Sequence, residues 1–209
     1  MPVRHNVAQG ECISSIADRY GFLPDTIWND PANADLKRER KNPNVLFPGD
    51  VVVVPDKRAR EETGGTGQTH RFRKKNTPAM LRLRLLDEEN RPRGGLKYTL
   101  EIDGRYSEGS TDSDGKIEHP IPPGAQKGVL LLGDEDIIPL SLGGMDPIEN
   151  PSGVQARLMN LGFDCGGVTG AIDSRTREAL KGFQRKNGLS PSGNVDEDTK
   201  AKLLQLHGS

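Results

Sequence analysis

The stretch GAIDSRT at residues 170–176 is echoed by GNVDEDT at residues 193–199. Each copy has a glycine, then an aliphatic residue beside an aspartate, and then a threonine; Asp173 and Asp196 are offset by 23 residues. An aspartate at this point caps a helix, because its side chain accepts a hydrogen bond from a free N–H of the first turn and its charge suits the positive helix end. The repeat therefore predicts two helices, and it assigns both carboxylates to capping rather than catalysis.

Apolar residues at helical spacing complete a third unit of the chain, residues 146–209. Glycines end the first two predicted helices, at Gly162 and Gly188, as is usual just beyond a helix C-terminus. The residues expected to point inward are Val154, Leu158 and Leu161 in the first helix, Thr176, Leu180 and Phe183 in the second, and Thr199, Leu203 and Leu206 in the third. This pattern predicts a compact three-helix bundle.

The same unit resembles the peptidoglycan-binding-domain family of cell-wall hydrolases along its full length. The resemblance rests on VQARL at 154–158, LGF at 161–163, residues 170–176, Ala179, FQ at 183–184, GL at 188–189, GNVD at 193–196 and Thr199. It implies a three-helix fold that holds wall peptide or glycan near the turns between helices. The positions so implicated are Asp164, Gly167, Arg175 and Gln184. For Arg175 and Gln184 the alternative is a solvated helix surface and an ordinary hydrogen bond from helix to loop.

The N-terminal stretch, residues 1–57, reads as strand, helix, helix, strand. Residues 3–7 and 51–54 are the expected strands. Ile13, Ile16, Ala17 and Tyr20 share one helical face that ends at Gly21, and Pro24 opens a second helix. Trp28 in that second helix is either a core residue or a platform on which a sugar ring stacks.

This first unit resembles the LysM family. The matching segments are NVAQGE at 6–11, IADRYGF at 16–22 and LFPGDVVVVP at 46–55. The resemblance implies binding of N-acetylglucosamine-containing glycans by two loops, at residues 9–13 and 44–49. The implicated residues are Gln9, Gly10, Glu11, Cys12, Ile13, Asn44, Val45, Leu46 and Phe47. A charged insert at residues 33–41, predicted to form a helical turn or two, lies beside the expected groove.

Between these units, residues 79–145 alternate apolar and polar side chains in short runs separated by Gly, Asp and Pro. This period of two predicts a small antiparallel β-sandwich. Residues 86–95, followed by the pattern Thr-Asp-x-x-Gly at 111–115, loosely resemble transthyretin-like and immunoglobulin-like bacterial repeats, which implies a spacer or docking unit. Asp112, Asp114 and Gly115 are typical of a tight turn, because no closing carboxylate follows at the distance that a calcium loop requires.

Composition limits what the whole chain does. Its 209 residues are 33% hydrophobic and 28% charged, which favours several small cores in a multidomain α+β protein over one large core. The net charge of −1 gives no general attraction to nucleic acid, and no apolar run is long enough to span a membrane. Residues 58–78 have the composition of a flexible linker, and their basic residues Arg71, Arg73, Lys74 and Lys75 are interpreted as a solvated linker end. The N-terminus lacks the pattern of a signal peptide, so synthesis in the cytoplasm is expected, with any export to the periplasm or wall by a non-classical route.

No catalytic constellation is evident in the sequence. The four histidines are scattered, no metal-ligand spacing occurs, and no phosphate-binding glycine loop follows a strand. We therefore expect no enzymatic activity, no cofactor and no metal, with Cys12 and Cys165 as reduced thiols. Two hypotheses follow: a non-catalytic peptidoglycan-binding protein, or a protein-docking accessory, adaptor or cargo of a contractile injection apparatus such as type VI secretion, with spike or effector proteins as partners.

Overall fold

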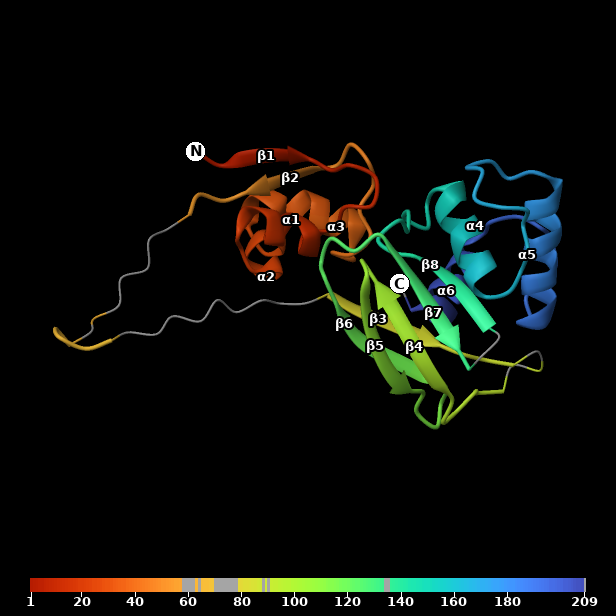
Figure 1. Ribbon diagram of the computed structural model, residues 1–209. Coiled ribbons are helices and arrows are strands. Elements are labelled where there is room, and N and C mark those ends of the chain that lie inside the picture. The colour runs from red at the N-terminus through yellow and green to blue at the C-terminus, as the bar shows by residue number, and fades with distance from the viewer. Residues whose placement is uncertain are drawn as a thin grey trace.

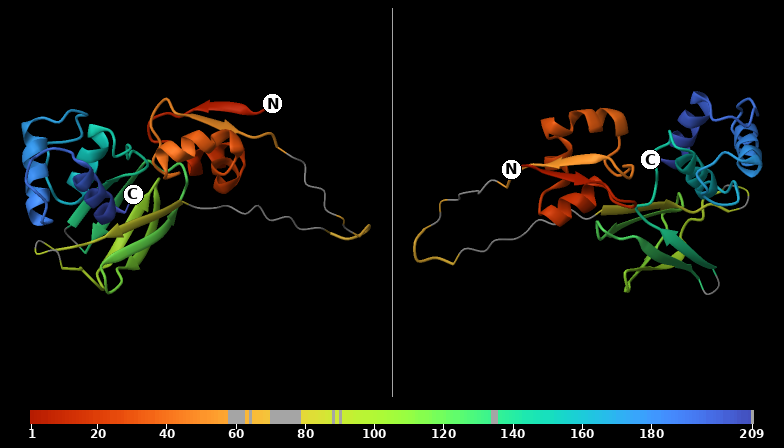
Figure 2. Two further views of the ribbon diagram at one scale, coloured as in Figure 1. Left: turned by 180° about the vertical axis from the view of Figure 1, so that it is seen from behind. Right: turned by 90° about the horizontal axis from the view of Figure 1, so that it is seen from above.

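The computed structural model describes residues 1–57, 63, 65–69, 79–87, 89, 91–133 and 136–208. The predicted linker and its basic residues therefore lie largely outside the described residues. Figure 1 shows three regions in chain order: a strand pair with short helices, a set of strands, and a group of three helices. The two further views in Figure 2 keep these regions distinct. Each has a hydrophobic core of its own, so the chain is an α+β protein with three cores.

The first region has two antiparallel strands and a series of short helices between them. Its elements in order are β1 (Val3–Asn6), α1 (Ile13–Tyr20), α2 (Pro24–Trp28), the 3-10 helix η1 (Pro31–Asn33), α3 (Ala34–Arg40) and β2 (Val51–Val54). The predicted order of strand, helix, helix and strand is present. The charged insert at 33–41 forms α3 and the last residue of η1, and Gly21 ends α1 in the left-handed conformation, as predicted.

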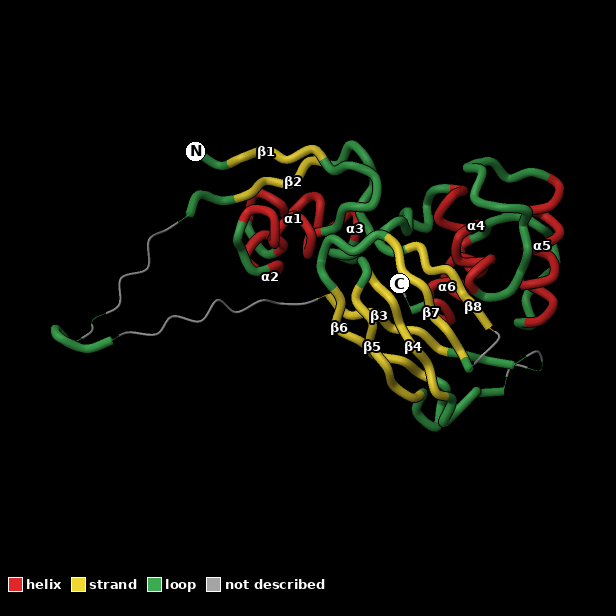
Figure 3. The backbone as a smooth tube through the Cα atoms, in the orientation of Figure 1, coloured by secondary structure: helices red, strands yellow, loops and turns green. Residues whose placement is uncertain are grey.

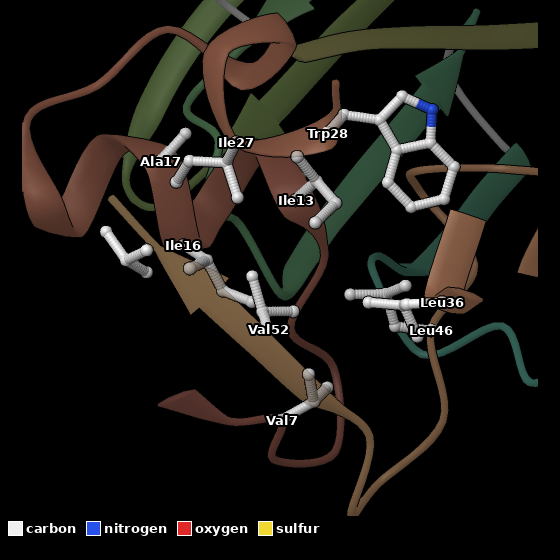
Figure 4. Close-up of a cluster of buried hydrophobic side chains, with 10 residues drawn as sticks. Val7, Ile13, Ile16, Ala17, Ile27, Trp28, Leu36, Leu46 and Val52 are labelled. Carbon is white, nitrogen blue, oxygen red and sulfur yellow. The ribbon is translucent and has the colours of Figure 1, made fainter. Parts of the chain in front are cut away.

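Trp28 lies in the core of this region. Figure 4 shows its indole together with Ile13, Leu36 and Leu46, which come from α1, α3 and the segment before β2. Only 7% of Trp28 is exposed, and the Lys37 ammonium lies 5.9 Å from the centroid of its ring. The core interpretation of Trp28 is therefore confirmed, and a sugar-stacking role is excluded in this conformation because the ring has no free face.

The second core lies between two antiparallel sheets, whose strands β3 to β8 are drawn in yellow in Figure 3. One sheet pairs β3 (Ala79–Arg84) with β6 (Lys116–Ile121), and the other has the order β5-β4-β7-β8. The strands of the second sheet are β4 (Lys97–Ile102), β5 (Arg105–Ser110), β7 (Lys127–Leu132) and β8 (Asp136–Ser141). This arrangement agrees with the predicted small antiparallel sandwich. Strand β5 was not predicted, because its inward positions are not apolar.

Three helices form the third region: α4 (Pro151–Asn160), α5 (Ser174–Lys186) and α6 (Glu197–His207). Asp173 and Asp196 cap α5 and α6 as predicted, since each accepts a 2.8 Å hydrogen bond from the backbone N–H three residues later. The inward placement predicted for Leu206 is wrong. This side chain is 46% exposed, and Leu203 is the α6 leucine that is fully buried. No helix in the described part of the chain is long and apolar enough to cross a membrane.

The first region also touches the segment that joins β8 to α4. Gln9 donates a 3.3 Å hydrogen bond from Nε2 to Oδ1 of Asp146. Gly10 lies directly against Gly143, where an added Cβ on Gly143 would be 2.8 Å from the Gly10 carbonyl oxygen. The turn that follows β1 is thus packed on another part of the same chain.

Candidate functional site

The third region contains the same hydrogen-bonded turn twice. In the first copy, the buried Gln155 of α4 accepts hydrogen bonds from the N–H groups of Thr169 and Gly170, each at 2.9 Å, through Oε1. Its Nε2 donates to the Ala171 carbonyl and to the Thr176 hydroxyl. One carboxamide therefore ties α4 to the turn and to the first residues of α5.

Gln184 of α5 does the same in the second copy. It accepts from Gly193 N–H at 2.9 Å and donates to the Asn194 carbonyl and the Thr199 hydroxyl, each at 3.0 Å. Gln184 has no exposed surface, so the prediction that its side chain contacts a ligand is wrong in this conformation. The alternative, a hydrogen bond from helix to loop, is the one observed.

The first turn is longer than the second. It spans eight positions from the helix-ending Gly162 to Gly170, whereas the second spans five, from Gly188 to Gly193; all four glycines have positive φ. The extra length contains Gly166 and Gly167, with φ values of 80° and 117° that side chains rarely adopt. The two copies thus share a scaffold but differ in the turn that it supports.

Three of the predicted site residues meet at this longer turn. Asp164 accepts a 2.7 Å hydrogen bond from Gly166 N–H and forms an ion pair with Arg175, Nη2 to Oδ2 at 3.3 Å. The Arg175 guanidinium lies over Gly166, where an added Cβ would be only 3.0 Å from it. Both charged side chains are exposed, Asp164 by 73% and Arg175 by 67%. The turn therefore presents a carboxylate, a guanidinium and backbone near Gly167 on one open surface.

Cys165 attaches the longer turn to the core of the third region. It is 1% exposed, and its Sγ lies 3.6 Å from the Gln155 carbonyl oxygen and 3.5 Å from the Gly167 carbonyl oxygen. Burial raises the pKa of the Cys165 thiol, which keeps it protonated and unreactive. Both cysteines are free and buried.

The two loops predicted to form a groove in the first region are held together. Ile13 N–H donates a 2.9 Å hydrogen bond to the Pro43 carbonyl, and the Ser14 hydroxyl lies 3.4 Å from Oδ1 of Asn44. Four of the predicted binding residues, Cys12, Ile13, Val45 and Leu46, have side chains buried in the protein. Only their backbone is left for contact with a ligand, whereas Gln9 and Asn44 are exposed, and Gly10 and Phe47 are half-buried.

Glu11 is committed to interactions within the first region. Its Oε2 lies 2.7 Å from His5 Nε2 and accepts from Ala8 N–H, and its Oε1 lies 2.6 Å from Arg19 Nη2. Burial alone would raise the pKa of Glu11, but these donors outweigh it and lower that pKa. Its side chain holds the turn after β1 on α1, which is a positioning role.

Arg40 and Asp50 form the other strong polar contact beside this groove. The Arg40 guanidinium donates two 2.7 Å hydrogen bonds to the Asp50 carboxylate, which also accepts from Phe47 N–H. Burial alone would raise the pKa of Asp50, whereas the hydrogen bonds from Arg40 and Phe47 lower it. The insert helix α3 is thus fastened to the PGD segment at residues 48–50.

Sequence reasoning missed Gln155 and Arg40. Gln155 and Gln184 are 29 positions apart, whereas the turns that they hold repeat after 23, so a comparison at fixed offset does not align them. Arg40 was one of several charges in the insert and had no distinguishing pattern. Asp112 was correctly interpreted: its Oδ1 accepts from the N–H groups of Asp114 and Lys116 and so closes a tight turn.

Within the described ranges, no group of three or more His, Cys, Asp or Glu side chains is placed to hold a metal ion. Comparison with known proteins bears on the third region. No curated protein and no solved structure matches the chain. Residues 149–203, which include α4, α5 and both glutamine-held turns, match the family described as "Putative peptidoglycan binding domain".

Proposed function

We propose that the chain is a non-catalytic protein that binds the bacterial cell wall, with the longer turn of the third region as its principal contact. The observation that carries this proposal is the exposed pair of Asp164 and Arg175 beside Gly166, in the region that matches the peptidoglycan binding family. The second turn has the same glutamine-held scaffold but lacks the extra residues and the exposed ion pair of the first.

The chemistry of the turn suits wall peptide and glycan. A carboxylate accepts hydrogen bonds from sugar hydroxyls and peptide N–H groups, and a guanidinium donates to carboxylates and acetamido carbonyls. Gly167 has no side chain to keep a ligand from the backbone, and an added Cβ there would meet no other atom within 4 Å. The ion pair between Asp164 and Arg175 is solvent-exposed, so opening it to receive a ligand costs about 1 kcal/mol or less.

Sedimentation of the full chain with insoluble purified peptidoglycan tests this proposal. The variant Arg175→Gln should reduce the bound fraction several-fold. Arg177→Gln is the matched control, because Arg177 lies on the same helix but hydrogen-bonds Asn194 at the second turn. Equal losses in the two variants, or no sedimentation of the unmodified chain, would contradict the assignment.

In this proposal the first region is a LysM-like unit that adds a second wall contact through residues 9–13 and 44–49. Two weak contacts on one chain reinforce each other when both reach the same polymer. The exposed Gln9 and Asn44 are the side chains available for this contact. Titration of the chain with chitin oligomers should then shift the NMR signals of Asn44, and Asn44→Ala should weaken the binding of these oligomers.

A second candidate function is protein docking within a contractile injection apparatus. One observation favours it: the turn after β1 is already packed against Gly143 and Asp146, so part of the proposed glycan groove is covered by the chain itself. Cross-linking in producing cells, followed by mass spectrometry, separates the two functions. Recovery of spike or effector proteins supports docking, and recovery of wall material alone contradicts it.

A further inference from the structure

The sandwich of the second region is open where β5 faces β6. Residues paired directly across two strands lie on the same face of a sheet. In β5, Arg105 pairs with Ile102 and Ser107 pairs with Leu100, so both polar residues lie on the inner face beside core residues of β4. On the opposite sheet, His119 pairs with Leu81, which also belongs to the core.

These polar residues line a cavity of about 470 Å³. This volume is within the range of about 300–1,000 Å³ that is usual for small-ligand sites. Apolar walls come from Leu100, Ile102 and the proline-rich segment after β6, while Asp18 of α1 contributes an acidic group from the first region. This open pocket thus combines apolar walls with one cation, one anion and an imidazole.

The polar groups of the cavity are available to a ligand. The side chains of Asp18, Arg105 and His119 make no hydrogen bond or ion pair with any other described residue. A guanidinium and an imidazole on the inner face of a sandwich keep their polar groups toward solvent, whereas apolar residues at these positions would pack the two sheets against each other. Their presence keeps the end of the sandwich open.

We propose that this cavity binds a short zwitterionic peptide with small side chains. The peptide carboxylate lies against Arg105, with His119 as a further hydrogen-bonding group, and its ammonium group lies toward Asp18. Small apolar side chains fit the accessible apolar surface of residues 120–123, since Leu100 and Ile102 behind it are buried. Free products of peptide hydrolysis have this chemistry; stem peptides of the cell wall share the two charged termini but also carry larger, charged side chains. The site is separate from the turn around Asp164 and does not depend on the wall-binding function.

Calorimetric titration of the full chain with trialanine tests the proposal, with N-acetyl-trialanine and trialanine amide as matched ligands. Trialanine should bind saturably, and blocking either terminus should weaken binding about tenfold. In Arg105→Gln, amidation should lose its effect while acetylation keeps it. In Asp18→Asn the reverse should hold. Arg82→Gln is the control for charge, because Arg82 lies on the outer face of β3 and pairs with the exposed Glu118.

The proposal is overturned if trialanine shows no saturable binding, or if amidation costs the same in Arg105→Gln as in the unmodified chain. Because Asp18 and Arg105 are exposed, both variants should fold, and unchanged thermal unfolding checks this. As a second measurement, trialanine should shift the NMR signals of the His119 imidazole and leave those of His5 unchanged. Parallel titration with the stem tripeptide L-Ala-γ-D-Glu-L-Lys distinguishes the two sources of such a peptide. Tighter binding of this tripeptide assigns the site to wall stem peptides, and tighter binding of trialanine assigns it to free short peptides.

Discussion

Gln155 and Gln184 perform the same task in successive turns of the third region. Each carboxamide accepts a hydrogen bond from the N–H of the turn glycine, Gly170 or Gly193, at 2.9 Å. Each also donates to the threonine hydroxyl that follows the capping aspartate, at 2.9 and 3.0 Å. Both side chains are fully buried, so these hydrogen bonds are shielded from water.

Replacing Gln184 with methionine should destabilise the third region by about 3 kcal/mol. The change keeps the volume of the side chain but leaves the Gly193 N–H and the Asn194 carbonyl without their partner, and each buried unpaired group costs about 1–3 kcal/mol. Hydrogen exchange of the α5 amides measures the loss. Gln205→Met, at an exposed site on α6, should change stability by less than about 0.5 kcal/mol.

Two glycine-to-alanine changes inside helices should have opposite effects. In an open helical position this substitution stabilises by about 1 kcal/mol. Gly182 of α5 is such a position, because an added Cβ would make an ordinary 3.6 Å contact with Phe163. Gly153 of α4 is not, because its Cβ would lie 2.1 Å from the Pro147 carbonyl oxygen and 2.5 Å from that of Asp146.

Thermal unfolding followed by far-UV circular dichroism compares the two variants. We expect Gly182→Ala to raise the midpoint and Gly153→Ala to lower it by several degrees. A higher midpoint for Gly153→Ala would mean that the segment before α4 moves away at little cost.

Asn33 should be the most sensitive polar residue of the first region. It is 1% exposed, it donates from Nδ2 to the carbonyls of Ile27 and Val53, and its Oδ1 accepts from Val53 N–H at 2.7 Å. Asn33→Leu leaves the N–H and carbonyl of Val53 unpaired, while the Ile27 carbonyl still accepts from Asp30 N–H, and should cost about 3 kcal/mol. Trp28, the single tryptophan, reports unfolding of this core by fluorescence. Asn29→Leu, at an exposed position, is the control, and comparable loss there would refute the assignment.

Acid should weaken the first region. The pKa of Asp50 is lowered in the folded protein, so its contribution to stability is complete above the unfolded pKa of about 4 and is lost as the pH falls through the folded value. Glu11, whose pKa is also lowered, acts in the same direction. Urea unfolding monitored at Trp28 between pH 7 and pH 2.5 should show this decline.

Arg40→Gln identifies the source of the acid effect. Removing the guanidinium should cost about 2 kcal/mol at pH 7, because it deletes two charged hydrogen bonds to Asp50. The remaining decline below pH 4 should be shallower than in the unmodified chain. Parallel curves for the two proteins would show that Asp50 is not the group responsible.

Local chemistry in the sequence predicted most elements of the fold. Helix caps at Asp173 and Asp196, the glycine stop at Gly21 and the β-branched run of β2 each follow from a few neighbouring residues. Strand β5 was not predicted, because its inner residues Arg105 and Ser107 face a cavity and so interrupt the alternation of apolar and polar side chains.

The candidate sites were harder to predict because they depend on residues far apart in the chain. Asp164 and Arg175 are close in sequence and were found together, whereas the glutamine that supports their turn comes from the preceding helix. Likewise, Gly143 packs against Gly10, and no sequence pattern relates these two positions. The burial of Ile13 and Leu46 results from the packing of the two loops on the core of the first region, which a local sequence pattern does not reveal.

The unequal length of the two glutamine-held turns gives the third region an internal reference. One carboxamide spans each turn, so the shorter loop after Gly188 shows that the same hydrogen bonds form with fewer residues than the loop after Gly162 contains. A chimaera in which the longer loop is cut to the five-position form would keep both anchors and both caps. It would keep the glutamine-held scaffold, but it would lack both the surface that the extra residues create and the core contact of Cys165.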